Sequence, residues 1–469
     1  MPSFANRADR HAAWVIFLVT LACYAYFFQG LGWNQMAHFA TMHSLVEFGT
    51  AEISRFSSLT QDVTVVGDRI YSNKPPGIAL LGTPFYFCII SIERILGLDV
   101  NSIWLNNLHI MTVILSALPG ALVNVVLFFA FRREQATLRM ALVLAGAFAF
   151  GSLSWPYAGL LMSHLLCALV ILSAWYLLTE SNLTIKKATV AGALIGLGIL
   201  SDVLTAPVAL IFALYLVARK MPARYWLAYC AGPGASVLLT LLYDRLAHGG
   251  AAISGPFHPT TTFSAPGLVF GEFGPPDWRR LYWISYQPMR GLFACCPIFV
   301  LCLFAPLFLR RPFHFPLDRI AILLTLLVYL FFYLTFIGWN GGWSIGPRYL
   351  IPALPLFWIF ALRPLQKIPK FISALIITVS IVYMLAATSV CVLSPVSGEG
   401  PPDKSDPVRS DLIVFVQGHT NHTQFGYNLA ALLRIPQPFQ LLPIFALLIF
   451  YFVYTFTRPR QPSISPEIL

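Results

Sequence analysis

The chain has 469 residues, of which 58% are hydrophobic and only 10% charged, and its mean hydropathy is +0.73. A water-soluble domain of this length would need far more polar surface, so the composition excludes a soluble globular protein and indicates a polytopic membrane protein. The net charge of +11 comes from short basic loops between apolar runs, which is typical of membrane topology and argues against nucleic-acid binding.

Apolar runs predict an all-α fold in a single domain covering residues 1–469, with about 12 to 13 transmembrane helices of about 20 residues each. Arg7 and Arg10 precede the first run, which lacks a recognisable cleavage site and is expected to be a retained span. The predicted spans are 12–31, 78–97, 104–131, 139–155, 158–179, 188–201, 203–218, 225–243, 291–309, 320–338, 349–363, 370–393 and 440–457.

The basic loops set the expected orientation, because Lys and Arg are retained on the cytoplasmic side. From residue 132 onward these loops alternate with the apolar runs, whereas two runs between residues 31 and 132 would return the chain to the wrong side. The run 78–97 is therefore expected to lie in or re-enter the outer leaflet. Loops 132–139 and 310–319 are expected in the cytoplasm. The stretches expected on the outer face are 32–77, 152–160, 244–290, 339–348 and 394–439.

The first outer loop, 32–77, is too long for a plain connector. Its first part, 35–48, alternates apolar and polar faces and predicts an interfacial helix that ends at Gly49. Asp62 and Asp68 are the acids considered for proton transfer, and Lys74 stands before a Pro-Pro step at headgroup depth, where an ammonium can meet a lipid phosphate. Ordinary snorkelling of Lys74 explains its position equally well.

Two further polar residues lie within or between apolar runs. His164 lies inside the run 158–179, and an intramembrane His is a functional hypothesis by default. No second His or acid follows it at i+3 or i+4, so a helical metal site is weakly supported. Asp202 lies at the tip of a short hairpin of apolar runs and is expected below the outer surface.

Two arginines stand on the expected outer side, against the positive-inside bias. Arg290 precedes the span 291–309, and Arg348 precedes Tyr349 in the segment "WNGGWSIGPRYLIPALP". These positions favour binding of a specific anion, although an interfacial Trp, Tyr and Arg belt is the simpler explanation for the two Trp residues.

The eight cysteines lie in or beside apolar runs and form no C-x-x-C pair. The sequence therefore predicts neither a disulfide framework nor a zinc site. No cofactor is expected, and a divalent metal requirement has no support from the sequence.

The first outer loop opens with Asn34-Gln35 and closes with "YSNKPPG", and a later segment reads "GPRYLIPALP". These motifs resemble those of the GT-C superfamily of polyprenyl-phosphate-sugar glycosyltransferases, in the branch of protein O-mannosyltransferases and aminoarabinose transferases (glycosyltransferase family 39). There the loop opens Asp-Glu, passes through an interfacial helix and closes Tyr-Phe-Glu-Lys-Pro-Pro. The resemblance covers most of the chain in topology, and its specific part is these two motifs.

The resemblance implies roles for several residues. Lys74 falls on the family lysine that approaches the lipid-linked phosphate, His164 falls near an acidic position of the site, and Asp202 falls near its polar hairpin tip. Asn34 departs from the family, which has its catalytic Asp there, because an amide cannot act as a general base. The base is then expected to be Asp62, ahead of Asp68 or Asp202, while Asn34 positions the acceptor or a sugar hydroxyl.

The implied activity is transfer of a sugar from a polyprenyl-phosphate donor to a lipid, glycan or protein acceptor at the non-cytoplasmic face of the plasma or inner membrane. Lys74, Arg348 and Arg290 would stabilise the departing phosphate, with Tyr349, His164 and Asp202 completing the substrate site. Two other classes stay open, a lipid-linked substrate transporter or flippase and a non-catalytic lipid-binding assembly subunit. Convergence of the outer acids and cations on one site would favour the enzyme.

Overall fold

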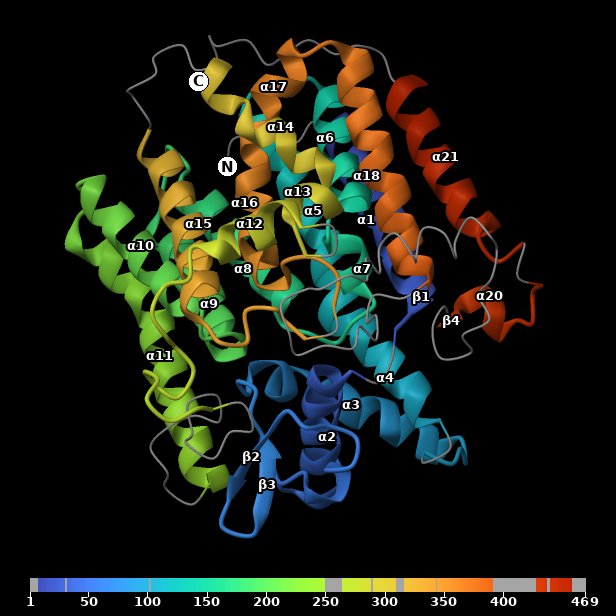
Figure 1. The fold of residues 1–469 in the computed structure, drawn as a ribbon, viewed down its shortest axis with the longest axis vertical. Helices are drawn as coiled ribbons and strands as arrows, with labels where there is room; N and C mark the ends of the chain where they lie inside the picture. The colour runs from blue at the N-terminus through green and yellow to red at the C-terminus, as the bar shows by residue number, and fades with distance from the viewer. Residues whose placement is uncertain are drawn as a thin grey trace.

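The computed structural model describes residues 7–29, 32–100, 103–248, 264–287, 290–308, 316–342, 344–390, 427–436 and 439–457. This part of the chain is almost entirely helical (Figure 1), which confirms the all-α membrane fold. The apolar helices are α1 (Arg7–Tyr26), α3 (Gly77–Ile95), α4 (Trp104–Thr112), α5 (Leu118–Arg133), α6 (Leu138–Gly151), α8 (His164–Leu178), α9 (Ile185–Ser201), α10 (Thr205–Ala218), α11 (Ala223–His248), α15 (Leu317–Thr335), α18 (Lys370–Val390) and α21 (Leu442–Thr457).

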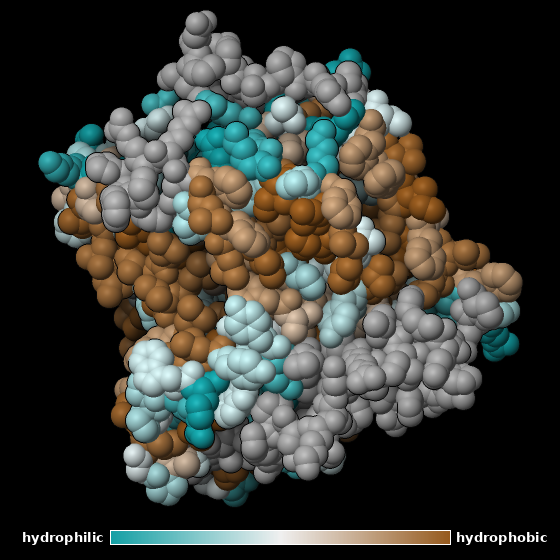
Figure 2. Space-filling view, turned by 45° about the horizontal axis from the view of Figure 1, so that its top comes forward, coloured by the Kyte–Doolittle hydropathy of each residue, from teal (hydrophilic) through white to brown (hydrophobic). Residues whose placement is uncertain are grey.

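Length and composition make many of these helices suitable for a bilayer. Among the described residues, six helical stretches are long and apolar enough to cross a membrane, and α6, α8, α10 and α21 are shorter apolar helices. One of the six stretches, Trp104–Arg133, joins α4 to α5 through a π-helical segment at Val113–Ala117. Figure 2 shows hydrophobic side chains gathered in a band across the face in view, with hydrophilic residues at its ends. Such a band is the surface that a lipid bilayer requires.

One predicted span is not a continuous helix. Residues 291–309 form α13 (Leu292–Cys295) and α14 (Val300–Leu303), each followed or preceded by 3-10 turns. Pro297 and Pro306 cannot donate the backbone hydrogen bonds that an uninterrupted α-helix needs, so the run breaks at these residues. The prediction of a simple helical span here was wrong.

The run that was not expected to cross, 78–97, forms α3. Its length and hydropathy would allow a span. Figure 1 shows it beside α2 (Trp33–Phe48) at the lower end of the view, transverse to long helices such as α18. Its first residue, Gly77, packs so closely on the end of α9 that a Cβ there would lie 2.6 Å from the Leu200 carbonyl oxygen. This orientation is the one expected of an interfacial helix.

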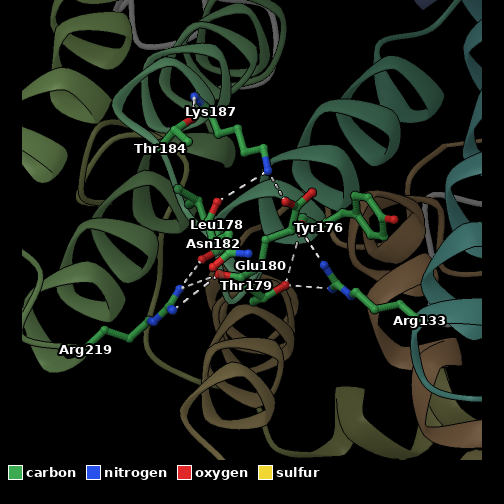
Figure 3. Close-up of polar contacts among 9 residues, drawn as sticks. All are labelled: Arg133, Tyr176, Leu178, Thr179, Glu180, Asn182, Thr184, Lys187 and Arg219. Carbon is green, nitrogen blue, oxygen red and sulfur yellow. Dashed lines mark hydrogen bonds and ion pairs between the residues drawn. The ribbon is translucent and has the colours of Figure 1, made fainter. Parts of the chain in front are cut away.

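The basic loops meet at one end of the helix bundle. Arg133 and Arg219 both donate hydrogen bonds to backbone carbonyls in the last turn of α8, and Lys187 pairs with Glu180 in the loop that follows (Figure 3). The last carbonyls of a helix lack the backbone donors of a following turn, and the two guanidinium groups bind the Tyr176 and Leu178 carbonyls in their place. The contacts tie together α5, α8, α9 and the loop after α10.

Two ion pairs join further loops to the same end. Arg132 Nε lies 2.9 Å from Asp9 Oδ1 at the start of α1, and Arg319 Nη2 lies 2.6 Å from Glu134 Oε2. The start of α1, the α5–α6 loop and the start of α15 therefore share one end, as the charge pattern predicts for the cytoplasmic side.

The stretches expected on the outer face meet at the other end. The Leu161 N–H donates to Gln35 Oε1 at 3.3 Å, and the Tyr157 hydroxyl donates to the Ile345 carbonyl at 2.8 Å. Strand β1 (Phe27–Phe28) pairs antiparallel with β4 (Tyr427–Asn428), which joins the end of α1 to the segment before α20 (Leu429–Leu432). The remainder of two predicted outer loops, 249–263 and 394–426, lies outside the described residues.

Labelling will test this sidedness. Gln135, after α5, and Asp68, in the first outer loop, are both exposed, so each can be replaced by Cys in a background where the exposed Cys88 is Ser. An impermeant maleimide added to intact cells is expected to label Asp68→Cys and to leave Gln135→Cys unlabelled until the membrane is permeabilised. The reverse pattern would invert the assignment, and labelling of both would contradict two-sided topology.

Candidate active site

The first outer loop contains a helix followed by a β-hairpin. Helix α2 ends at Gly49, whose φ of 65° is left-handed and suits a residue without a side chain, which confirms the predicted helix and its end. Residues 35–42 are all buried, so the first half of this helix packs on every side and does not have the polar face that the sequence suggested. Strands β2 (Val63–Val66) and β3 (Arg69–Ser72) then pair antiparallel around Gly67 and Asp68. Sequence analysis missed this hairpin, although β-branched residues flanking a Gly-Asp step are a hairpin signal.

The hairpin brings Asp62 and Lys74 together, because residues that flank the open end of two paired strands become neighbours. Lys74 Nζ lies 3.1 Å from Asp62 Oδ1, and the Asn73 N–H donates to the Asp62 carbonyl at 3.2 Å. Asp62 is 7% exposed, so the hairpin buries this carboxylate instead of leaving it on the loop surface. The Thr60 hydroxyl anchors the preceding residues by donating to the Trp33 carbonyl at 2.8 Å.

Asp68 does not join this pair. It is exposed in the β2–β3 turn, at the far end of the hairpin from Asp62 and Lys74. Its position is that of a turn residue.

His164 and Asp202 form a second pair across two helices. His164 begins α8, Asp202 caps the C-terminal end of α9, and His164 Nδ1 lies 3.9 Å from Asp202 Oδ2. Both ring nitrogens of His164 are buried without a hydrogen-bond partner in the described part of the chain. No acid lies three or four residues after His164 on its own helix, and Asp202 at the end of α9 is instead the acid beside its ring.

Arg348 and Arg290 both approach the glycines of the segment 339–348. Arg348 Nη2 donates to the Tyr349 hydroxyl at 3.1 Å, and its Nε is buried without a partner among the described residues. Arg290 Nη2 donates to the Gly342 carbonyl at 2.9 Å, and burial lowers its pKa. Gly341 permits the close approach, because a Cβ there would lie 3.0 Å from Arg348 Nε.

Electrostatic coupling links these groups. Burial raises the pKa of Asp202 to about 6, while the charges of Lys74 and Arg348 act to lower it. Arg348 also interacts electrostatically with Asp62 and with His164. We refer to Lys74, Asp62, His164, Asp202 and Arg348 as the Lys74 cluster; its members come from the first outer loop, α8, the α9–α10 turn and the start of 3-10 helix η6 (Arg348–Ala353).

Two residues near this cluster were missed from the sequence. His38, in α2, is 3% exposed and interacts electrostatically with both Lys74 and Asp62. Glu272, in the segment 264–287, has its pKa raised to about 7 by burial, against the opposing effect of Lys74. The signal for His38 was its spacing of four residues from Asn34 on a predicted helix, whereas Glu272 was only one acid in a long outer loop.

Asn34 lies at the start of α2 with its Oδ1 buried and without a hydrogen-bond partner in the described part of the protein. The neighbouring Gln35 accepts the bond from Leu161 while its Nε2 is likewise unpaired there. Buried polar atoms in proteins are normally paired, so these positions favour contact with a ligand or water.

Within the described residues, no group of three or more His, Cys, Asp or Glu side chains is arranged to hold a metal ion. The expectation that no cofactor is required stays a prediction.

Comparison with solved structures identifies the fold. No family model and no curated protein sequence matches the chain. The structure of ArnT from Cupriavidus metallidurans bound to undecaprenyl phosphate aligns with a TM-score of 0.51 at 15% identity, covering 95% of this chain and 76% of ArnT. The apo form of the same enzyme gives 0.51 at 14% identity, covering 95% and 75%.

An Archaeoglobus fulgidus oligosaccharyltransferase aligns with a TM-score of 0.48 at 14% identity, covering 99% of this chain and 61% of that protein. The alignments with ArnT show that this chain has the same fold as ArnT, which agrees with the resemblance of its two sequence motifs to the GT-C superfamily.

Proposed function

We propose that the protein is a membrane glycosyltransferase that moves a sugar from a polyprenyl-phosphate donor to an acceptor at the non-cytoplasmic face. The observation that carries the proposal is the buried Lys74–Asp62 pair, electrostatically coupled to Arg348 and Asp202, at one end of a GT-C fold. ArnT, which shares this fold, has been solved with undecaprenyl phosphate bound.

The cations supply the chemistry that a departing phosphate needs. Negative charge develops on the phosphate as the bond to the anomeric carbon breaks, and fixed cations in a site with little water stabilise it strongly. Lys74 is mostly buried, and Arg348 Nε and Arg290 Nη1 are buried donors without a partner among the described residues. A phosphate would satisfy such donors.

His164, Asp202 and Tyr349 are suited to hold the sugar. A neutral imidazole, a carboxyl group and a phenol offer both donors and acceptors to sugar hydroxyls. His164 has both ring nitrogens unpaired among the described residues, and its ring lies edge-on to Tyr349 with centroids 6.0 Å apart.

Convergence of the outer acids and cations supports the enzyme over a transporter. Asn34 is consistent with the alternative function of a non-catalytic lipid-binding assembly subunit, because the acid that the family uses as a base is absent at that position. Binding of a lipid phosphate alone would not separate the enzyme from such a subunit, so turnover must be measured.

The test is incubation of the purified protein with a panel of polyprenyl-phosphate hexoses and pentoses and with lipid, glycan and peptide acceptors. We expect release of lipid phosphate that depends on one donor and one acceptor class. Binding of undecaprenyl phosphate without release from any donor would favour the subunit, and uptake of donor into vesicles without cleavage would favour a transporter.

The two acids of the first outer loop are expected to differ. Asp62→Asn will lower turnover by about 10²-fold, the lower part of the range for losing one preorganised charge-stabilising group, because Lys74 loses the carboxylate that holds it in place. The KM for the donor is not expected to rise, since no carboxylate then competes with the donor phosphate for Lys74. Asp68→Asn, at the exposed hairpin tip, will change turnover by less than about twofold, since surface substitutions have small effects. Equal losses in the two variants would contradict the distinction.

A further inference from the structure

Helix α2 carries a second polar residue on the face of Asn34. Residues four apart on an α-helix lie one above the other, so His38 stands one turn along from Asn34. The family resemblance puts its catalytic acid at position 34, where the amide of this chain cannot take a proton. His38 is therefore placed near the position from which the family's base acts.

The surroundings of His38 place a buried imidazole among charged groups. The residue is 3% exposed. Lys74 and Asp62, at the open end of the hairpin, interact electrostatically with it, as does His164 at the start of α8. Burial, together with the Lys74 charge, lowers the pKa of His38 to about 3, so the ring is neutral near pH 7 and keeps one lone pair.

Asp62 is less suited to accept the proton. Its carboxylate is already paired with Lys74 at 3.1 Å. Protonating Asp62 would also leave the Lys74 ammonium unpaired in a largely buried site. The negative charge of Asp62 instead stabilises a protonated imidazole nearby.

We propose that His38 accepts the proton of the acceptor hydroxyl during sugar transfer, with Asp62 as a positioning residue that holds Lys74 and favours the imidazolium. This inference rests on the proposed function. The acceptor oxygen bonds to the anomeric carbon, the bond from that carbon to the phosphate oxygen breaks, and its electron pair leaves with the phosphate beside Lys74. The hydroxyl proton passes to a ring nitrogen of His38.

Two features of the reaction suit a weak base here. The hydroxyl becomes strongly acidic as its oxygen bonds to the electron-poor anomeric carbon, so a modest base is sufficient. Burial is the larger cause of the weak basicity of His38, and the donor phosphate beside Lys74 would offset the smaller cause, the positive charge of Lys74. Donor binding thus prepares His38 for its role.

The test compares His38→Gln and His38→Ala with His43→Gln, on the donor and acceptor pair that the panel identifies. His43 lies on the same helix, but its Nδ1 is hydrogen-bonded to the Tyr86 hydroxyl at 2.8 Å, which makes it a matched control. We expect both His38 variants to lose about 10²- to 10⁴-fold in turnover, the range for general bases, while inhibition by undecaprenyl phosphate stays within about threefold. His43→Gln should keep its turnover.

Added imidazole gives the readout that a purely structural role would not. It is expected to restore part of the turnover of His38→Ala and none of that of Asp62→Asn. Retention of turnover in His38→Gln, or loss of turnover in His38→Ala without imidazole rescue, overturns the assignment of the base while the proposed function stands. Absence of transfer by the wild-type protein from every donor would instead remove the proposed function itself.

Discussion

Replacing Lys74 by Met will reduce sugar transfer by about 10²- to 10³-fold, the loss seen when one preorganised charge-stabilising donor is removed. The ammonium lies in the buried pair with Asp62, where its charge is weakly screened and would act on the departing phosphate. Arg348→Met is expected to act in the same direction. Turnover with the identified donor, and inhibition by undecaprenyl phosphate, measure the two effects.

Two controls separate chemistry from folding. Arg69→Met removes a cation from the same hairpin whose side chain is 63% exposed, and it should leave transfer unchanged. Lys74→Met leaves Asp62 without its partner, so the neutral double variant Lys74→Met/Asp62→Asn tests whether lost activity follows the missing cation or a damaged loop. A folded double variant with wild-type turnover and undecaprenyl phosphate inhibition would rule out the leaving-group role.

Replacing Arg132 will lower the free energy of unfolding more than breaking any of the other ion pairs described above. Arg132 and Asp9 are 5% and 1% exposed and lie 2.9 Å apart at the end of the bundle where the basic loops meet. Arg132→Met leaves a buried carboxylate without its cation, which costs about 3–5 kcal/mol in comparable cases. The free energy of unfolding in detergent will fall accordingly.

The matched control is Arg94→Met, which breaks the pair with Glu47, where the Arg94 side chain is 56% exposed. A pair of this kind contributes about 0–1 kcal/mol. The double variant Arg132→Met/Asp9→Asn removes both buried charges and should recover much of the stability lost in Arg132→Met. A single variant as stable as the wild type would show that Asp9 finds another partner or water.

Features set by local sequence were accessible before the structure. Apolar runs gave the helices because a bilayer demands about 20 such residues in succession, and Gly49 marked the end of α2 because a left-handed residue was needed there. Pro297 lies within the apolar run 291–309 and breaks its helix, because proline lacks the backbone donor that a continuous helix needs.

The candidate site depended on pairings that no local pattern contains. His164 and Asp202 are 38 positions apart in the numbering and meet only because α8 packs against α9. Asp62 and Lys74 needed the hairpin between them, and without that hairpin Asp62 read as an exposed loop acid. The interaction of His38 with Lys74 and Asp62 likewise depends on how α2 packs against the hairpin, which the helical pattern of α2 does not contain.

The cations around the end of α8 also bear on how the chain is made. Arg133, Lys187 and Arg219 are the charges that would orient the nascent helices as they leave the ribosome and enter the bilayer, and in the finished protein Arg133 and Arg219 bind the α8 carbonyls while Lys187 pairs with Glu180. Neutralising one of them is therefore expected to affect both membrane insertion and the stability of the folded protein. A fraction of chains would insert with the wrong orientation, and the correctly inserted fraction would unfold more easily. Yield from cells and heat resistance after purification should consequently be scored apart for every variant at this end.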